Sequence, residues 1–423
     1  MYNISRMFYL RNEKKYNSEN NSRREVFWIF LKTKRINIFS GTIILIILGT
    51  ALTGVILTRA KKLAEVSPAE ITVPEIHKKI KVEEAEIFKP KYDYVYTPVS
   101  ISMEDVKTRG CVADGILSEY GDDTNSATAM INRSNCIYLH RALETWADPP
   151  DFKKATEIMA KIKKPEIIYG MFIAEAIRKG ERSFEKDGEE FDFSDMCRKG
   201  SENVWGEHTC KPNIGSKEYR EYLKEITREA MDIGIQSFLF GQIYYQDSSD
   251  LEKSKMHKVL NDMRSYAKEK GMDIIIGAQT GNITDENYLR MFDYIEGGVG
   301  MGEDGKIESG PCWSHMQSCW ALLWNERYAL KANNVLLHLD WSGLLFDDMS
   351  VFARMNKEKR EKTLRYLYGY FTSRNIGFMM PMMATLNKQN NGCYGPKKGF
   401  YSAHRKYSCQ DEDVINEILA GQK

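Results

Sequence analysis

Residues 235–279, IQSFLFGQIYYQDSSDLEKSKMHKVLNDMRSYAKEKGMDIIIGAQ, decide the fold. This stretch begins with an apolar run at 235–243 and ends with a second apolar run at 273–279. Between them, the apolar residues of 251–271 recur at helical spacing. Two β-type runs separated by a helix predict two parallel strands that are joined by a crossover helix.

The same alternation extends over most of the chain. Eight expected strands over about 300 residues favour an α/β fold of the (β/α)8 TIM-like barrel type. A doubly wound open sheet is the alternative, but no Gly-x-Gly-x-x-Gly turn follows an early strand. The first two strands are the weakest, because CIYLHRALETW at 136–146 could also begin a helix. The six further runs are 111–117, 136–140, 166–173, 294–300, 335–340 and 376–383.

A second feature is the apolar segment INIFSGTIILIILGTALTGVILT at 36–58, which holds 23 residues and no charge. As a helix it is long enough to cross a hydrocarbon core of about 30 Å. It is too long for a cleaved signal peptide, and RAKK follows it without a small-residue cleavage pattern. We therefore expect a transmembrane signal anchor, preceded by a cytoplasmic tail at 1–35. A stalk at 59–100 and the barrel domain at 101–423 would follow.

The number and positions of the cysteines predict the cellular compartment of the barrel domain. All eight follow the apolar segment, and an even number on one side indicates disulfides in an oxidising environment. Basic residues before the segment favour a cytoplasmic N-terminus, so the barrel is expected outside the cytoplasm, at the cell membrane. No Cys-x-x-Cys spacing for zinc occurs. Nearest-neighbour pairing would join Cys111 to Cys136, Cys197 to Cys210, Cys312 to Cys319 and Cys393 to Cys409.

Several functional classes lack their signals. The composition, with 42% hydrophobic and 28% charged residues, is that of a globular protein, and the net charge of +1 gives no bias toward nucleic acid. The chain has no Gly-x-Ser-x-Gly elbow, no His-Glu-x-x-His and no phosphate-cradling glycine loop. We therefore expect no nucleic-acid partner and assign no metal or cofactor.

Polar residues at the expected C-terminal ends of the strands form an acid-rich rim, where the active site of a parallel barrel lies. In VLLHLD at 335–340, side chains two apart share a face, so Leu336, His338 and Asp340 point toward the barrel interior. The rim comprises Asp114, Glu119, His140, Arg141, Glu144, Glu175, Gln242, Tyr244, Asp247, Gln279, Glu296, His338 and Asp340.

Within this rim we expect Glu296 and Asp340 to be a catalytic carboxylate pair, with His338 orienting them or shuttling a proton. The glycines after Glu296 permit close approach of the backbone. A buried Asp or His on a strand is also a common structural hydrogen-bonding residue, and this alternative stays open.

Candidate substrate-binding residues are Glu119, Gln242, Asp247, Gln279 and Trp341. The glutamines would hold hydroxyl groups, and tryptophans in or beside loops offer the flat apolar platforms that sugar rings need. Glu119 and Asp247 stand at loop starts, where turn formation is the commoner reason for an acid. The platform candidates are Trp146, Trp205 and Trp341.

The strand pattern and acidic rim over residues 105–390 resemble glycoside-hydrolase-like (β/α)8 barrels. RGCVADGILSEYG, ENVWGEHTCKP and NNVLLHLDWSG are also similar to an uncharacterised group of bacterial membrane-anchored proteins. The first resemblance implies a carbohydrate partner and hydrolysis by paired carboxylates, with a non-catalytic glycan- or protein-binding barrel as the alternative. The large retaining clan carries Asn-Glu after its fourth strand, whereas this chain has GQIYYQD there, so no family residue is carried over.

Overall fold

The computed structural model describes residues 92, 94–179, 185–186, 189–281, 283–307, 330–341 and 345–421. All the described residues belong to one unit, Ile87–Lys423. The expected anchor at 36–58, its tail and most of the stalk lie outside the described residues, so these boundaries stay predictions. Within the described ranges, no helix has the length and apolar character needed to cross a membrane.

A ten-stranded sheet in the order β12-β11-β10-β9-β8-β3-β2-β1-β13-β14 forms the centre of the fold. Every pairing in it is parallel except that of β13 with β14. The strands are β1 (Gly110–Ala113), β2 (Tyr138–Glu144), β3 (Ile168–Ile173), β8 (Ile235–Phe240), β9 (Ile275–Ala278), β10 (Tyr294–Gly298), β11 (Val335–His338), β12 (Gly377–Phe378), β13 (Met380–Thr385) and β14 (Phe400–Ser402).

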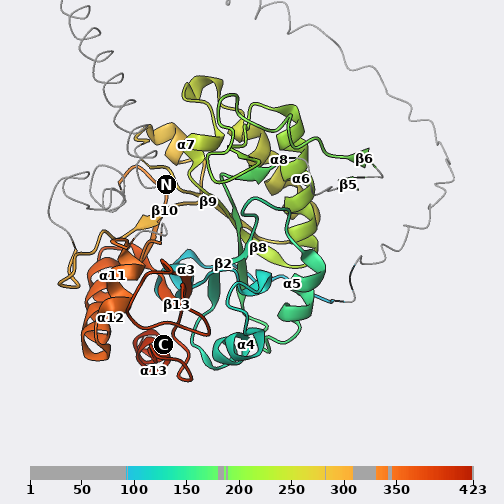
Figure 1. The fold of residues 1–423 in the computed structure, drawn as a ribbon. Coiled ribbons are helices and arrows are strands. Elements are labelled where there is room, and N and C mark those ends of the chain that lie inside the picture. The colour runs from blue at the N-terminus through green and yellow to red at the C-terminus, as the bar shows by residue number, and fades with distance from the viewer. Residues whose placement is uncertain are drawn as a thin grey trace, which may run out of the picture. The chain divides into compact units, whose positions relative to one another are not determined.

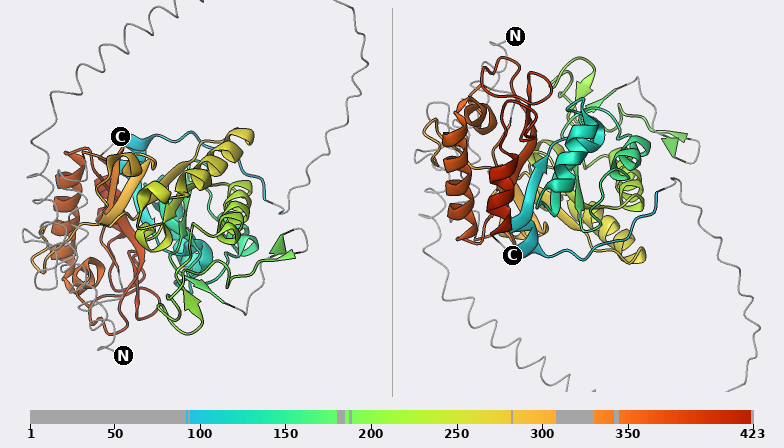
Figure 2. Two further views of the ribbon diagram at one scale, coloured as in Figure 1. Left: turned by 90° about the horizontal axis from the view of Figure 1, so that it is seen from above. Right: turned by 90° about the horizontal axis from the view of Figure 1, so that it is seen from below.

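The sheet curls back on itself through one segment of chain. β12 pairs with β11, β13 pairs with β1, and only Met379 separates β12 from β13. The two ends of the parallel sheet are therefore consecutive pieces of one extended segment. This arrangement is consistent with the expected TIM-like barrel, and the helices lie around the outside of the curled sheet (Figures 1 and 2).

The helices follow from caps and from apolar faces. In α6, Ser216 accepts a hydrogen bond from the backbone of Tyr219, and Leu223, Ile226 and Ala230 are buried on one face. The longer helices are α3 (Met103–Arg109), α4 (Thr124–Arg133), α5 (Phe152–Met159), α6 (Lys217–Asp232), α8 (Met256–Glu269), α11 (Asp348–Arg354), α12 (Lys357–Thr372) and α13 (Glu412–Ala420). Short elements are η1 (Ile116–Ser118), α7 (Ile243–Gln246), η2 (Leu251–Lys253), α9 (Glu286–Leu289), β4 (Ile177–Arg178), β5 (Glu185–Lys186), β6 (Glu189–Glu190) and β7 (Thr209–Cys210).

All eight sequence-predicted strands are present, with shifted ends. The run at 136–146 is a strand and not a helix, whereas the run predicted at 111–117 stops at Ala113. The reason is Gly115, whose φ of 61° turns the chain into η1. The predicted helices within 217–234, 251–271 and 358–375 are likewise found.

Among the described residues, the core consists of two apolar clusters. The larger lies between the sheet and its helices, and the smaller contains alternate strand residues such as Val112, Tyr138 and Leu336. Side chains that alternate along a barrel strand point inward, so the smaller cluster fills the interior. Tyr294 fits there because its neighbour on β9 is Gly277, where a Cβ would come within 2.1 Å of the Tyr294 ring.

Three disulfides occur among the described residues, and their pairing agrees with the nearest-neighbour prediction. Cys111 is joined to Cys136, Cys197 to Cys210 and Cys393 to Cys409. The predicted fourth pair, Cys312 with Cys319, lies outside the described residues. The first disulfide links the beginning of the barrel to the segment that enters β2.

Removing the first disulfide by the double change Cys111→Ala and Cys136→Ala should lower the free energy of unfolding by about 3 kcal/mol. The bridge closes a loop with a sequence separation of 25, which restricts the unfolded chain. Urea denaturation followed by circular dichroism measures the change. A loss under about 1 kcal/mol would mean that the unfolded chain is not restricted as this model of disulfide stabilisation assumes.

Candidate functional site

A cleft of about 590 Å³ opens at the C-terminal ends of the parallel strands. Most of its lining residues come from strand ends or from the first residues after them, which is where the fold concentrates polar side chains. The lining consists of Asp114, Tyr120, Arg141, Glu144, Trp146, Phe172, Glu175, Trp205, Gln242, Gln279, Asp340, Trp341 and Thr385.

Arg141 is placed in the cleft by an irregularity in β2. The pairing of β2 with β3 shifts register between Leu139 and Leu143, and Arg141 has a φ of 55°. A residue other than glycine with this φ departs from regular strand geometry, so the bulge redirects the side chain. Its guanidinium lies 3.8 Å from the centre of the Phe172 ring and 4.4 Å from that of Trp341. Arg141 thereby bridges aromatic side chains of the third and seventh barrel strands.

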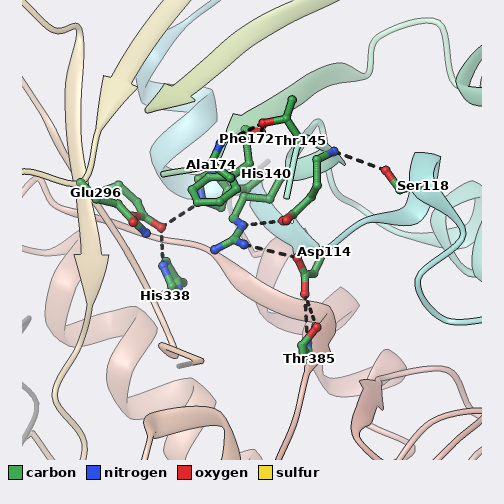
Figure 3. A network of polar contacts seen from close by, with 12 residues as sticks. Asp114, Ser118, His140, Thr145, Phe172, Ala174, Glu296, His338 and Thr385 are labelled. Carbon is green, nitrogen blue, oxygen red and sulfur yellow. Dashed lines mark hydrogen bonds and ion pairs between the residues drawn. The ribbon is translucent and has the colours of Figure 1, made fainter. Parts of the chain in front are cut away.

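Two carboxyl groups neutralise this arginine. The Arg141 Nε atom donates to Glu144 at 2.8 Å, and its Nη2 atom lies 3.8 Å from Asp114 Oδ1. The other Asp114 oxygen accepts from the backbone nitrogen and the hydroxyl of Thr385, at 3.0 and 2.8 Å. Burial raises the pKa of Glu144 well above its usual range, and Arg141 opposes this rise. Both acids are therefore paired with groups of the protein itself. Figure 3 shows the contacts of Asp114 with Thr385.

Glu175 forms a second polar group in the cleft, with Gln242. Burial raises the pKa of Glu175, and the Gln242 amide donates to its Oε1 atom. Its Oε2 atom is buried and has no hydrogen-bond partner among the described residues. Gln242 has a φ of 31°, and its backbone nitrogen donates to Gln279 Oε1 at 3.0 Å. The ends of β3, β8 and β9 are thus tied together by amide and carboxyl side chains.

Asp340 lies across the barrel from Glu175, two residues beyond the end of β11. Its backbone nitrogen donates to Asp348 at 3.1 Å, and the same carboxylate accepts from the backbone nitrogens of Gly300 and Met301. Asp348 therefore fixes the chain after β10 and after β11 at once. Burial raises the pKa of Asp340 to about 7.

Aromatic side chains line the cleft beside these acids. The ring centres of Trp146 and Trp205 are 5.7 Å apart, and Trp205 lies 5.9 Å from Tyr245. The Trp205 indole donates to the backbone oxygen of Glu175 at 3.2 Å, which fixes this ring next to that acid. All three tryptophans that were expected as sugar platforms, Trp146, Trp205 and Trp341, line the cleft.

Beneath the cleft, His140, Glu296 and His338 form a group whose side chains are fully buried. Glu296 Oε1 lies 3.1 Å from His140 Nε2 and is also paired with His338 Nε2 (Figure 3). Burial by itself would raise the pKa of Glu296, but the two histidines lower it below the usual range. The pKa of His140 falls to about 4, chiefly because of burial. We call these three residues the buried triad.

The structure separates the sequence-predicted site residues into three groups. Asp340, Gln242, Gln279 and Trp341 line the cleft, whereas Glu296 and His338 belong to the buried triad below it. Glu119 and Asp247 are absent from the lining. The assignment of Glu296, Asp340 and His338 to catalysis stays a prediction.

The two residues outside the cleft have other contacts. Glu119 is paired with Lys154 at 2.9 Å on the surface. Asp247 is buried and accepts hydrogen bonds from the hydroxyl groups of Ser254 and Tyr288, so its carboxylate ties this loop to the residues before α8 and to α9.

Four polar cleft residues were part of the expected rim but were not selected as candidates: Asp114, Arg141, Glu144 and Glu175. Their position at strand ends was the available signal. The bulge in β2 and the conformations of the loops decide which of the rim acids share one cleft. Sequence spacing predicts neither the bulge nor the loop conformations. Tyr120, Phe172 and Thr385 had no signal in the sequence beyond ordinary strand or turn residues.

No protein-family model and no curated protein matches the chain. Among solved structures, a GH113 β-1,4-mannanase is similar with 13% identity and a TM-score of 0.43, over 74% of this chain and 98% of that one. A GH27 β-L-arabinopyranosidase from Geobacillus stearothermophilus has 11% identity and a TM-score of 0.41, over 76% and 78%. The glycoside hydrolase domain of PelA from Pseudomonas aeruginosa has 9% identity and a TM-score of 0.34, over 60% and 89%. At this level of similarity, the site must be judged on its own geometry.

Replacing Arg141 by Gln should lower the free energy of unfolding by about 3 to 5 kcal/mol, because Asp114 and Glu144 would lose their buried counter-charge. Thermal and urea unfolding measure the loss. The control Arg290→Gln removes a half-exposed partner of Glu286, 2.9 Å away, and should cost under about 1 kcal/mol. Equal effects of the two changes would show that Arg141 does not hold the cleft together.

Proposed function

We propose that the protein binds a carbohydrate chain in the cleft and hydrolyses it, with Glu175 and Asp340 as the pair of carboxyl groups. The observation that carries this proposal is their placement on opposite sides of one tryptophan-lined cleft. β3 and β11 are separated by three strands in the sheet order, β8, β9 and β10. In the other direction lie β2, β1 and the segment of β12 and β13, so the two carboxyl groups follow opposed strands.

This arrangement supports glycoside hydrolysis on chemical grounds. The reaction needs one carboxyl group that gives a proton to the leaving oxygen and a second that acts as a base or nucleophile. Glu175 fits the first role because its burial favours the protonated form and its Oε2 atom has no partner among the described residues. Asp340 takes the second role in this proposal, which requires its ionised form. Activity therefore needs a pH above the Asp340 pKa, which burial raises to about 7. Glu296 is not used here, since it lies below the cleft and its Oε1 atom is occupied by two histidines.

The tryptophans support a sugar ligand. Trp146, Trp205 and Trp341 present flat apolar surface beside hydrogen-bonding amides, the combination that carbohydrate recognition requires. Gln242 and Gln279 would bind hydroxyl groups in this scheme.

The location of the activity is also proposed. A protein held by residues 36–58 with its cleft outside the cytoplasm would meet surface or cell-wall carbohydrates. The three disulfides support an oxidising compartment, because such bridges are rare in reducing cytosol.

The first test is hydrolysis of a panel of polysaccharides and aryl glycosides by the full chain in mild detergent. Glu175→Gln and Asp340→Asn should each reduce kcat by about 10²- to 10⁴-fold, the usual contribution of a positioned acid or base. Glu166→Gln is the matched control, since Glu166 is exposed just before β3, at the opposite end of the barrel. Circular dichroism shows that the variants fold.

Two outcomes would contradict the proposal. Activity that survives both substitutions would exclude this pair. Binding of oligosaccharides by calorimetry, without any hydrolysis, would favour the alternative of a non-catalytic carbohydrate-binding barrel.

The pH profile gives an independent prediction. Glu175 must hold its proton, so kcat/KM should fall as the pH rises through the pKa of Glu175, which burial sets above the ordinary glutamate range. Arg141 and Lys211 both lower this pKa by their positive charge. The charge of Glu175 also raises the pKa of Tyr219 and of Tyr245.

Lys211→Met removes one of these charges and should move the alkaline limb of kcat/KM to higher pH. The control Lys163→Met removes an exposed lysine near the opposite end of the barrel and should leave the profile in place. A shift to lower pH in Lys211→Met, or no shift, would argue against Glu175 as the proton donor.

A further inference from the structure

The buried triad brings three potential metal ligands to one point from three different strands. His140 belongs to β2, Glu296 to β10 and His338 to β11, and the three donor atoms lie within 4.8 Å of one another. All three side chains are fully buried, so water does not compensate them. The mechanism proposed above assigns no role to any of them.

When His338 is neutral, its unprotonated ring nitrogen faces the place where the three donor atoms meet. Its Nδ1 atom lies 2.9 Å from the backbone oxygen of Leu339. A carbonyl oxygen only accepts hydrogen bonds, so Nδ1 carries the proton. The lone pair of Nε2 then faces Glu296, and a ring fixed in this way through Nδ1 is typical of metal-binding histidines.

The His140 ring is also oriented through its Nδ1 atom, but its partner is a hydroxyl group and not a backbone oxygen. Its Nδ1 atom lies 2.8 Å from the Tyr138 hydroxyl, which lies 3.0 Å from Ser237 Oγ and 3.3 Å from the Tyr294 hydroxyl. This hydroxyl can accept a hydrogen bond from the Nδ1–H group, because its own proton can be donated to Ser237 or to Tyr294. The Nε2 atom of His140 is thereby directed at Glu296 Oε1, 3.1 Å away.

Glu296 is not satisfied by its protein contacts. Both histidines converge on its Oε1 atom, while Oε2 is buried without a hydrogen-bond partner among the described residues. Among the described residues, His338 Nε2 has no hydrogen-bond partner either, although it is close enough to Glu296 Oε1 for an ion pair. A buried carboxylate oxygen without a partner is costly, and proton sharing among these groups leaves Oε2 unpaired.

We propose that the buried triad binds one divalent transition-metal ion, with Zn²⁺ as the first candidate. Two imidazole nitrogens and a carboxylate are ligands that Zn²⁺, Fe²⁺ and related ions accept, and the unpaired Oε2 atom offers a fourth donor. Sequence spacing does not reveal the site, because its residues are 156 and 42 positions apart along the chain. The ion would join β2, β10 and β11 directly below the cleft.

The test is the metal content of the full chain, expressed with added Zn²⁺ or Co²⁺ and freed of loose metal by chelator and gel filtration. Inductively coupled plasma mass spectrometry should find about one ion per chain, since a fully buried ion exchanges slowly. The Co²⁺ protein should also show visible absorption bands. Glu296→Gln and His338→Asn should each lower the metal content at least about tenfold, and His257→Ala, which removes an exposed histidine of α8, should not.

If the variants do not fold, the metal content of the wild-type protein is enough to test the proposal. Wild-type protein without bound metal, and with the same unfolding temperature whether or not Zn²⁺ was supplied, overturns the proposal. Metal content that is equal in the wild type and in folded Glu296→Gln also overturns it. Hydrolytic activity is not needed for either readout, so failure of the proposed function leaves this test intact.

Discussion

The structure depends on the segment 377–385, which pairs on both sides. Its first part bonds to β11 and its second part to β1, so the backbone hydrogen bonds of one extended stretch bring the two ends of the sheet together. This closure sets Asp114 beside Thr385 and places both near the chain that leaves β11. Without it the strand ends would line an open edge, and the acids that follow them would face solvent separately.

Closure also creates an interior that must be filled and neutralised. The lower part is apolar, with Tyr138, Tyr294 and Leu336. At the upper end, charges are buried in compensating sets, Arg141 with two acids and Glu296 with two histidines. His140, Glu296 and His338 come from three different strands, so this set forms only when the barrel is closed. Arg141 and Glu144 both belong to β2, and Asp114 follows the neighbouring β1. Loss of one charged side chain from a set therefore leaves the other charges of that set buried without compensation.

The sequence predicted the strands because their apolar runs are long and are separated by amphipathic segments with helical spacing. It also predicted that Asp340, Trp341, Gln242 and Gln279 would be near strand ends, and all four line the cleft. Periodicity tells which face a residue occupies but not its height along the barrel axis. Glu296 and Asp340 both point toward the barrel interior, but Glu296 lies in the buried layer and Asp340 lines the cleft.

Local irregularities account for the remaining differences. The bulge in β2 turns Arg141 into the cleft, although strict alternation would place it on the face opposite to His140. Glu119 and Asp247 stand at loop starts, and their contacts within and between loops keep both out of the cleft lining. The three triad residues carry no spacing signal, since only the pairing of distant strands makes them neighbours.

The buried triad and the cleft are coupled by the geometry of β11. His338 and Asp340 are two residues apart, and the Trp341 ring lies 4.7 Å from that of His338. The same ring packs on Arg141, which contacts Glu144 and Phe172. A change in the position of His338 therefore shifts the side chains of the cleft through rigid contacts between rings. Trp341 thus connects the two layers, since it contacts both His338 and Arg141 and lines the cleft, whereas His140, Glu296 and His338 are not among the lining residues.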